Sequence, residues 1–195
     1  HRLIWEEIGV VPGENVPPAI DTVLKLYDSN LKQALGSYAV WRYFTGTRAD
    51  TIHYFKYSQL MPTSFVDSIH RHQGPGSGNQ GSYAPQGPGG TSFIEFYTTP
   101  DYLLKNSFNG TPYGEWQVSH IGYRGPSGHK QYLMDTTDFW SVLPTMSHDT
   151  FVLIPTVGNQ YGVGEDYSYS GTAIASNPSP PQAPELQVCS ILAPI

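Results

Sequence analysis

Residues 116–134 read WQVSHIGYRGPSGHKQYLM, and this stretch decides the fold class. Two runs rich in apolar and aromatic residues, 116–123 and 130–134, flank the turn sequence GPSG at 125–128. Gly and Pro in such a cluster mark a tight connection between two extended segments. The stretch therefore predicts a β-hairpin.

Further strands are expected on both sides of this hairpin. Residues 151–157 form an uninterrupted apolar run, which is typical of a strand buried on both faces. The aromatic and β-branched segments 38–44, 51–57, 93–98 and 167–175 are also predicted to be strands. Together with the hairpin they give at least six strands.

One segment before these strands has a helical pattern. Its apolar residues recur at helical spacing between residues 20 and 35. Asp21 is suited to cap the start of this helix, and Gly36 is suited to end it. The polar sequence DSN at 28–30 is suited to divide it into two short helices, the second capped by Ser29 or Asn30.

The remaining segments are expected to be irregular. Residues 73–90 are rich in Gly, Pro, Ser and Gln and hold almost no aliphatic residue, which predicts an exposed loop. Residues 1–18 mix apolar pairs with turn signals and are expected to be extended, and the Pro-rich residues 177–195 are expected to form an extended tail. Residues 19–176 are left as one folded domain.

The composition of the 195 residues favours the same fold class. Charged residues make up 13% and aromatic residues 13%, and the chain holds 14 Tyr, 20 Gly and 17 Pro. A chain so rich in turn formers and poor in helix formers is predicted to be an all-β sandwich or barrel. This composition excludes a coiled coil or helical bundle, and the 38% of apolar residues excludes a wholly disordered chain.

Charge and cysteine content bound the possible partners. The net charge is −6 and no basic stripe is present, so contact with nucleic acid is expected to be minor. The longest apolar runs have about five residues, far fewer than the roughly twenty of a membrane-spanning helix. The single cysteine, Cys189, cannot form an internal disulfide. The chain shows no signal-peptide pattern and starts at His1, which fits a processed product or a trimmed chain.

Histidines are the first candidates for metal ligands. The amine and imidazole of His1 together could chelate copper, as in lytic polysaccharide monooxygenases, with a second histidine from elsewhere in the chain. The candidates for that second ligand are His53, His70, His72, His120, His129 and His148. The lack of a disulfide and of that family's opening residues favours the simpler interpretation that His1 is an arbitrary start.

His70 and His72 form a second histidine pattern. On a strand this spacing places both imidazoles on one face. A metal site needs a third ligand, and no carboxylate or thiol cluster is near in sequence. A solvated pair beside the Gly-rich stretch is the preferred interpretation.

The other short motifs do not predict an active site. Glu165 and Asp166 are adjacent carboxylates that could bind Ca²⁺, but a polar strand start after a Gly turn explains them as well. Ser119-His120 and Ser147-His148 are only sequence neighbours, and a nucleophile–base pair is defined by geometry. We therefore expect no catalytic residue and no cofactor, and leave open whether a metal binds near Glu165 and Asp166.

Four motifs in order resemble picorna-like virus capsid proteins of the order Picornavirales, in the dicistrovirus, iflavirus and algal marnavirus types. Residues 30–48, NLKQALGSYAVWRYFTGTR, resemble the segment in which a short helix leads into an aromatic strand. Residues 13–16, GENV, resemble the lead-in of these proteins, and residues 93–100, FIEFYTTP, resemble a strand in the middle of the domain. Residues 164–169, GEDYSY, with a following Pro178, resemble the closing strand and tail.

The resemblance has two departures. Tyr43, Phe44 and Thr45 stand between Arg42 and Gly46, where the family tends to have Arg-Gly directly. In the closing motif, Glu165 and Tyr167 replace the first Asp and the Phe of an Asp-Asp-Phe motif that is implicated in maturation cleavage in relatives.

The resemblance implies an eight-stranded antiparallel jelly-roll β-sandwich with one or two short helices. It implies a structural subunit of a small icosahedral positive-strand RNA virus, released from a polyprotein and assembled in the host cytoplasm into a virion. The implied partners are other capsid proteins of the same virus, a host receptor and, at most weakly, genomic RNA. The resemblance implies no membrane span.

A second interpretation stays open at this point. A secreted β-sandwich could bind carbohydrate as a lectin-like module, or oxidise it with copper at His1. Aromatic side chains such as Trp116, Trp140 and Tyr123 could stack on sugar rings. For Trp116 and Trp140 we prefer a place in the core.

Overall fold

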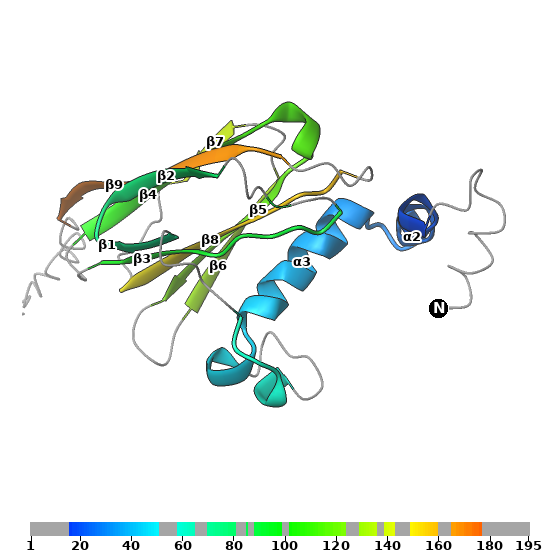
Figure 1. Ribbon diagram of the computed structural model, residues 1–195, viewed down its shortest axis with the longest axis horizontal. Helices are drawn as coiled ribbons and strands as arrows, with labels where there is room; N and C mark the ends of the chain where they lie inside the picture. Colours follow the sequence, from blue (N-terminus) through cyan, green and yellow to red (C-terminus); the bar gives the residue numbers. More distant parts are fainter. Residues whose placement is uncertain are drawn as a thin grey trace, which may run out of the picture.

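The chain folds as a sandwich of two β-sheets with two α-helices (Figure 1). The computed structural model describes residues 16–50, 58–64, 70–80, 85, 88–98, 102–123, 129–135, 139–142, 149–159 and 165–176. The predicted β-sandwich with two short helices is confirmed at this level. Within the described residues, the helices are too short and too polar to cross a membrane.

The elements follow one another along the chain in a simple order. The helices are α2 (Val16–Lys25) and α3 (Leu31–Tyr43), and the 3-10 turns are η1 (Gly46–Arg48), η2 (Ser58–Leu60) and η4 (Pro112–Gly114). The strands are β1 (Arg71–Gln73), β2 (Gly76–Gln80), β3 (Ile94–Tyr97), β4 (Tyr102–Gly110), β5 (Gln117–Tyr123), β6 (His129–Asp135), β7 (Phe139–Val142), β8 (Thr150–Thr156) and β9 (Tyr167–Ser176).

The strands form two sheets, which we call sheet A and sheet B. Sheet A has the order β1-β3-β8-β5-β6, and sheet B has the order β2-β9-β4-β7. All neighbours are antiparallel except β1 and β3. Figure 1 shows sheet B as the upper layer, sheet A below it, and α3 against the outer side of sheet A.

The predicted hairpin is confirmed as β5 and β6. The two strands pair antiparallel from Gln117 opposite Asp135 to Tyr123 opposite His129. β5 also pairs with β8 on its other side, so the hairpin adds two strands to the middle and edge of sheet A. The predicted turn at 125–128 lies outside the described residues.

The position of strand β8 explains why its residues 151–155 are all apolar. Phe151 and Leu153 belong to the core between the two sheets, whereas Val152 and Ile154 belong to the core between sheet A and α3. Because helix and sheet B cover opposite faces of the strand, neither set of alternate side chains meets water. The strand predicted at 151–157 is thus confirmed together with its burial.

The two cores share no residue. The core between the sheets contains Ile94, Phe96, Leu104, Phe108, Trp116, Val118, Phe151, Leu153, Val157, Tyr167 and Tyr169. The core under α3 contains Ala39, Val40, Tyr43, Phe44, Phe93, Ile121, Val152 and Ile154. Sheet A therefore lies between two apolar layers.

The strand predicted at 38–44 is wrong, because these residues complete helix α3 and its C-cap. Aromatic and β-branched residues favour strands only weakly, and burial on one helical face outweighs that preference here. Gly36, Ala39, Val40 and Tyr43 repeat at helical spacing and are all buried. Gly36 accordingly does not end the helix.

The helical region is divided at residues 28–30, as predicted. Asp28 has a positive φ of 54°, and the side chain of Asn30 caps α3 by accepting a hydrogen bond from the amide of Gln33 at 2.9 Å. Asp21 does not cap α2, which begins at Val16. Instead its Oδ1 accepts a hydrogen bond from the amide of Leu31 at 2.7 Å, so it holds the start of α3.

Four segment predictions need correction or lie beyond the described part. Residues 76–80, expected in an exposed loop over 73–90, form strand β2 at the edge of sheet B. Their glycines leave room for aromatic rings, since a Cβ on Gly76 would collide with the ring of His72. Residues 16–18, expected to be extended, are the first turn of α2. The strand predicted at 51–57 and the tail 177–195 lie outside the described residues.

Candidate functional site

Glu165, the first residue of the closing motif, is an internal structural residue. Its side chain is only 6% exposed. It accepts hydrogen bonds from the hydroxyl of Thr111 and, at 3.3 Å, from the amide of Asn159. The same amide donates to the carbonyl of Tyr113 at 3.0 Å, so the group fixes the η4 turn against the start of β9. Glu165 therefore serves the fold at this place.

The other two residues of this motif point to different surroundings. Tyr167 lies in the core between the sheets, where its ring stacks on Phe108 with 5.5 Å between ring centroids. Burial raises the pKa of the Tyr167 hydroxyl above its ordinary value. Asp166 is exposed. The structure thus does not bring Glu165, Asp166 and Tyr167 together as one reactive group.

His70 and His72 both lie beside Tyr169 of β9. The Nε2 atom of His72 and the hydroxyl of Tyr169 are 2.9 Å apart, and the His72 ring stacks on Phe96 with centroids 4.9 Å apart. The ring of His70 lies 5.9 Å from that of Tyr169. Burial lowers the pKa of His72 below its ordinary value. The pair is therefore packed into the sandwich rather than solvated as expected.

In the part of the chain that the structure describes, no further side chain completes a metal site around His70 and His72. Among the described residues, no three or more His, Cys, Asp or Glu side chains are grouped so that they could hold an ion. His1, His53 and His148 lie outside the described residues, as does the side chain of His129.

His120 forms a hydrogen-bonded bridge between the two sheets. It is fully buried on β5, and its Nε2 lies 2.8 Å from Nδ2 of Asn106 on β4. Its ring stacks on Phe151 with centroids 5.3 Å apart and an interplanar angle of 5°. Because solvent does not reach His120 and Ser119, these neighbours in sequence do not form a nucleophile–base pair open to substrate.

Glu95 on β3 is the centre of a charged cluster that the sequence motifs did not reveal. Its side chain is 3% exposed. Oε1 accepts hydrogen bonds from the hydroxyl of Tyr43 at 2.7 Å and from Nη1 of Arg48 at 3.0 Å. Oε2 accepts from the hydroxyl of Tyr97 at 2.6 Å and from Nε of Arg71 at 3.3 Å. Each carboxylate oxygen thus has two donors, which is the arrangement a buried charge needs.

The cluster joins four elements around a small opening. Arg48 in η1 also lies over the ring of Tyr43, with its guanidinium carbon 4.1 Å from the ring centroid, and its Nε donates to the Tyr43 carbonyl at 3.1 Å. A cavity of about 300 Å³ is lined by Tyr43, Arg48, Arg71, Glu95, Tyr97 and Thr150.

The two phenols of this cluster are held in their neutral form. Burial and the negative charge of Glu95 raise the pKa of Tyr43. Burial and the hydrogen bond to Glu95 raise the pKa of Tyr97 as well. Two arginines and two neutral phenols surround a satisfied carboxylate. They attach α3 and η1 to sheet A and β1 to its neighbour β3. The sequence signal for this cluster was a single Glu inside the apolar run FIEFY at 93–97.

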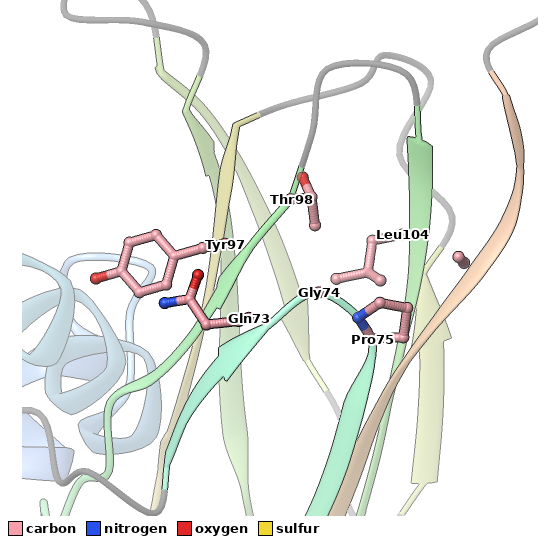
Figure 2. A pocket seen from close by; sticks show the side chains of 7 residues that line it. Gln73, Gly74, Pro75, Tyr97, Thr98 and Leu104 are labelled. Carbon is pink, nitrogen blue, oxygen red and sulfur yellow. The ribbon is translucent and has the colours of Figure 1, made fainter.

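A second opening lies at one end of the sandwich (Figure 2). It has a volume of about 340 Å³ and is lined by Gln73, Gly74, Pro75, Tyr97, Thr98, Leu104 and Ala173. Figure 2 shows Pro75 and Leu104 facing each other across it, with Gln73 and Tyr97 on the other side of Gly74. The described residues of its lining carry no charged side chain, so this opening can accept a small apolar group.

The outer side of α3 carries an exposed aromatic stripe. Tyr38 is 51% exposed and Trp41 40%, and both share this face of the helix with Arg42. The guanidinium carbon of Arg42 lies 6.0 Å from the centroid of the Tyr38 ring. Beside it, Leu60 and Met61 are exposed as well. Tyr, Trp, Arg and Met are the residue types enriched in protein interfaces.

A groove runs between this helix and the segment after η2. We call it the α3 groove; it is lined by Tyr38, Arg42, Thr45, Met61, Pro62, Thr63 and Ser64 and has a volume of about 530 Å³. The hydroxyl of Thr45 donates at 2.9 Å to the carbonyls of Arg42 and Pro62, which fixes one wall against the other. The α3 groove thus combines the half-exposed ring of Tyr38 with the side chains of Met61 and Pro62.

Trp116 lies in the core between the two sheets. It is fully buried, and its Nε1 donates to the carbonyl of Thr111 at 3.0 Å. It therefore belongs to the core, as preferred above, and cannot stack on a sugar ring. The side chains of Tyr123 and Trp140 lie outside the described residues.

Comparison with known proteins adds little to this geometry. No family model matches the chain, and no curated protein matches it. Among solved structures, it is similar to the pre-peptidase C-terminal domain of a collagenase from Bacillus anthracis, at 8% identity and a TM-score of 0.33. That match covers 52% of this chain and 90% of the other.

Proposed function

We propose that this chain is a structural capsid subunit of a small icosahedral RNA virus, with a jelly-roll fold and no catalytic site of its own. The observation that carries the proposal is the strand order of the two sheets. Strands β2, β9, β4 and β7 face strands β3, β8, β5 and β6, and β1 extends the edge beyond β3.

The path of the chain through these strands supports a jelly roll. From β2 to β5 each successive strand lies in the other sheet, and the same holds from β6 to β9. Two sets of four strands that alternate in this way, joined by one hairpin between β5 and β6, are what the double Greek key of a jelly roll would require, and this agreement supports the proposal. Jelly rolls occur in viral coats and also in lectins, so the fold alone does not choose the function.

The order of the sequence motifs favours a viral coat protein over a lectin. The stretch 30–48 covers α3 and η1, the stretch 93–100 contains β3, and the stretch 164–169 leads into β9. Each resembles in sequence a segment of picorna-like coat proteins in the same order along the chain, although residues 38–43, where the resemblance implies an aromatic strand, belong to helix α3. The motifs at these places supply Asn30, Arg48, Glu95 and Glu165, which hold the helix, the cluster and the η4 turn.

A role in contact rather than in chemistry agrees with the described side chains. Glu165 and Tyr167 are occupied inside the fold, so we propose no maturation chemistry for Glu165, Asp166 and Tyr167. The net charge of −6 favours sister subunits over genomic RNA as the main partners. A host receptor is a further partner in this proposal, and the location is the virion.

The test is sedimentation of native material that contains this chain. A lysate is separated on a sucrose gradient, and each fraction is treated with nuclease before RNA and this chain are quantified. We expect the chain in particles of virion size, together with other polypeptides and protected RNA. A detergent-treated aliquot is the control, because membrane-bound material then leaves the fast fractions and a protein shell does not.

Two results would overturn the proposal. One is a chain that sediments as a single species of 21.5 kDa. The other is a chain found in large particles without protected RNA or companion polypeptides.

A further inference from the structure

We propose that the cavity beside Glu95 binds a small oxyanion, a carboxylate or phosphate group held by Arg71 and Thr150. The cavity is the one of about 300 Å³ that the Glu95 cluster borders, and we call it the arginine cavity. The inference concerns a small ligand and does not depend on the proposed virus shell. Every residue that carries it lies in the described part of the chain.

The described lining of the arginine cavity carries an excess of positive charge. Arg48 and Arg71 bring two positive charges, and Glu95 brings one negative charge. Tyr43 and Tyr97 add none, because burial and the contact with Glu95 raise the pKa of both phenols. One positive charge therefore remains at this place in a chain whose net charge is −6, and it favours an anionic ligand.

Glu95 leaves no place for a cationic ligand. Its two carboxylate oxygens already accept hydrogen bonds from four donors, which are the hydroxyls of Tyr43 and Tyr97 and one N–H group each of Arg48 and Arg71. A metal ion or an amine would have to displace one of these donors and would be repelled by two guanidinium groups. The charge of Glu95 is thus used inside the protein.

Arg48 is a fixed part of the cavity wall. Its Nε donates to the carbonyl of Tyr43 at 3.1 Å, its Nη1 to Glu95 at 3.0 Å, and its Nη2 to the carbonyl of Ser64. Its guanidinium carbon also lies 4.1 Å from the centroid of the Tyr43 ring. Because these contacts already order the side chain, Arg48 supplies its positive charge with little further loss of side-chain entropy on binding.

Arg71 is suited to contact the ligand directly. Its side chain is 49% exposed, and within the described residues it uses only Nε for a hydrogen bond, which Glu95 accepts at 3.3 Å. Both Nη groups are therefore left for a ligand, while Nε keeps the guanidinium in position. Two parallel N–H groups of a guanidinium match the spacing of two oxygens in a carboxylate or phosphate. We expect Arg71 to bind the oxyanion in this bidentate manner.

Thr150 adds a neutral donor to the site. It is half-buried on β8, opposite Tyr97 of the neighbouring strand β3, and both residues line the cavity. Its hydroxyl can donate a hydrogen bond to an oxygen of the ligand. A volume of about 300 Å³ is at the lower end of the range for ligand pockets, which indicates a small ligand.

The experiment adds inorganic phosphate to the full chain and follows the width of the phosphate ³¹P resonance. Bound phosphate tumbles with the protein, so the resonance broadens as the bound fraction rises. We expect saturable binding with a Kd on the order of 1 mM, which corresponds to two or three hydrogen bonds to a charged ligand. Ionic strength is held constant with NaCl, so that unspecific screening is the same in every sample.

Arg71→Gln is the main variant, and Arg42→Gln is its matched control. Gln lacks the guanidinium of Arg71, so the affinity for phosphate should fall about tenfold, the factor of one charge-assisted hydrogen bond. Arg42 is an exposed arginine on α3 that does not line the arginine cavity, so its replacement removes the same charge and should leave the affinity unchanged.

Three results would overturn the proposal. The first is the lack of saturable phosphate binding by the wild type. The second is an affinity of Arg71→Gln equal to that of the wild type. The third is an equal loss in Arg71→Gln and Arg42→Gln, which would show that phosphate responds only to the total charge of the chain.

Thr150→Val tests the site without touching the Glu95 cluster. Valine keeps the shape of the side chain and removes only the hydroxyl, so the affinity for phosphate should fall about fivefold, the factor of one ordinary hydrogen bond. Thr172→Val is the matched control, because Thr172 is exposed on β9 and does not line the cavity. An unchanged affinity of Thr150→Val would overturn the assignment of this hydroxyl to the site.

Sodium acetate distinguishes the two sources of the oxyanion. It replaces NaCl at the same ionic strength in a sample that is half saturated with phosphate. A narrower phosphate resonance would show that a planar carboxylate binds at the same site, whereas an unchanged resonance would show that the site selects the phosphate group. Both results support an oxyanion site and assign its ligand class.

Discussion

Two glutamates, Glu95 and Glu165, are buried to almost the same degree and held in opposite ways. Glu95 is 3% exposed and contacts two arginines and two phenols. Glu165 is 6% exposed and contacts a hydroxyl and an amide, with no cation near it in the described part of the chain. Both lie at the margin of the sandwich.

The difference shows what each buried charge does for the fold. Around Glu95 the charge is balanced by Arg48 and Arg71, so α3, η1 and β1 are attached to β3 by ionic hydrogen bonds. Around Glu165 neutral donors position one turn against the start of one strand. Removal of the Glu95 carboxylate should therefore lower the free energy of unfolding more than removal of the Glu165 carboxylate.

The largest effect is expected for Glu95→Gln. The change leaves Arg48 and Arg71 beside a neutral amide whose own N–H groups face other donors. We expect a loss of about 3 kcal/mol in the free energy of unfolding, the order seen when one partner of a buried ion pair is removed. Urea unfolding followed by fluorescence at pH 7 measures it. A loss below that of the Glu165 variant would contradict the comparison.

Tyr43→Phe should rank second and depend on pH. It removes one hydrogen bond to a buried charge, which we expect to cost about 2 kcal/mol at neutral pH. The pKa of Tyr43 in the folded chain is raised above the ordinary value of 10.0. Above pH 10 the unfolded chain therefore loses the phenol proton while the folded chain keeps it, and the free energy of unfolding falls as the pH rises.

The stability of the wild type and of Tyr43→Phe should be compared at several pH values. The phenyl ring of the variant cannot ionise, so the stability difference between wild type and variant should narrow above pH 10. Urea unfolding at several pH values from 8 upward tests it. Thr111→Val is the matched control, since it removes a hydroxyl from Glu165 that does not titrate in this range. A gap that widens with pH would show that the Tyr43 pKa is not raised.

Glu165→Gln should have a smaller effect. The amide keeps one carbonyl oxygen for the donors around it, and no arginine loses its partner within the described residues. We expect a loss of about 1 kcal/mol, the net value of one ordinary hydrogen bond. Thermal unfolding on the same samples as the Glu95 variant gives the ranking. An equal loss in both variants would remove the distinction between the two sites.

Arg71→Gln should have the smallest effect of the four. The side chain of Arg71 is 49% exposed, and its contact with Glu95 is a single one at 3.3 Å. Solvent screens such a pair, so we expect about 0.5 kcal/mol, and less at high salt. Urea unfolding in roughly 0.05 M NaCl, where screening is weak, and in roughly 1 M NaCl, where it is strong, measures the loss and its dependence on salt. A loss that does not change with salt would indicate packing rather than charge.

Sequence patterns correctly predicted the parts of this fold in which the local sequence favours a single secondary structure. The hairpin at 116–134, the doubly buried strand at 151–157 and the helix break at 28–30 are all confirmed. In each, local chemistry and final environment agree: turn residues between apolar runs, apolar residues on both faces, or a side chain that caps a helix.

Patterns failed where the environment overruled local preference. Residues 38–44 resemble a strand because aromatic residues lie on both sides of α3. Tyr43 faces the core, whereas Tyr38 and Trp41 are exposed. Residues 76–80 resemble a loop because they are Gly-rich, yet the missing side chains make room for His72 and Tyr169 beside β2. Strand β4 was not predicted, because residues 105–107 are polar in succession and hide the alternation, although Asn106 is buried between Leu104 and Phe108.

The sequence by itself determined the β-rich fold class, the place of the hairpin and of the most buried strand, and the low number of charges. Tertiary structure alone decided that Glu95 meets Arg48 and Arg71, that Glu165 meets Thr111, and that Tyr38 stays exposed while Tyr43 is buried five residues later. Secondary structure follows from periodicity over a few residues, which a sequence displays directly. A charge cluster or an exposed groove joins segments tens of residues apart, and only packing of the sheets fixes which of them meet.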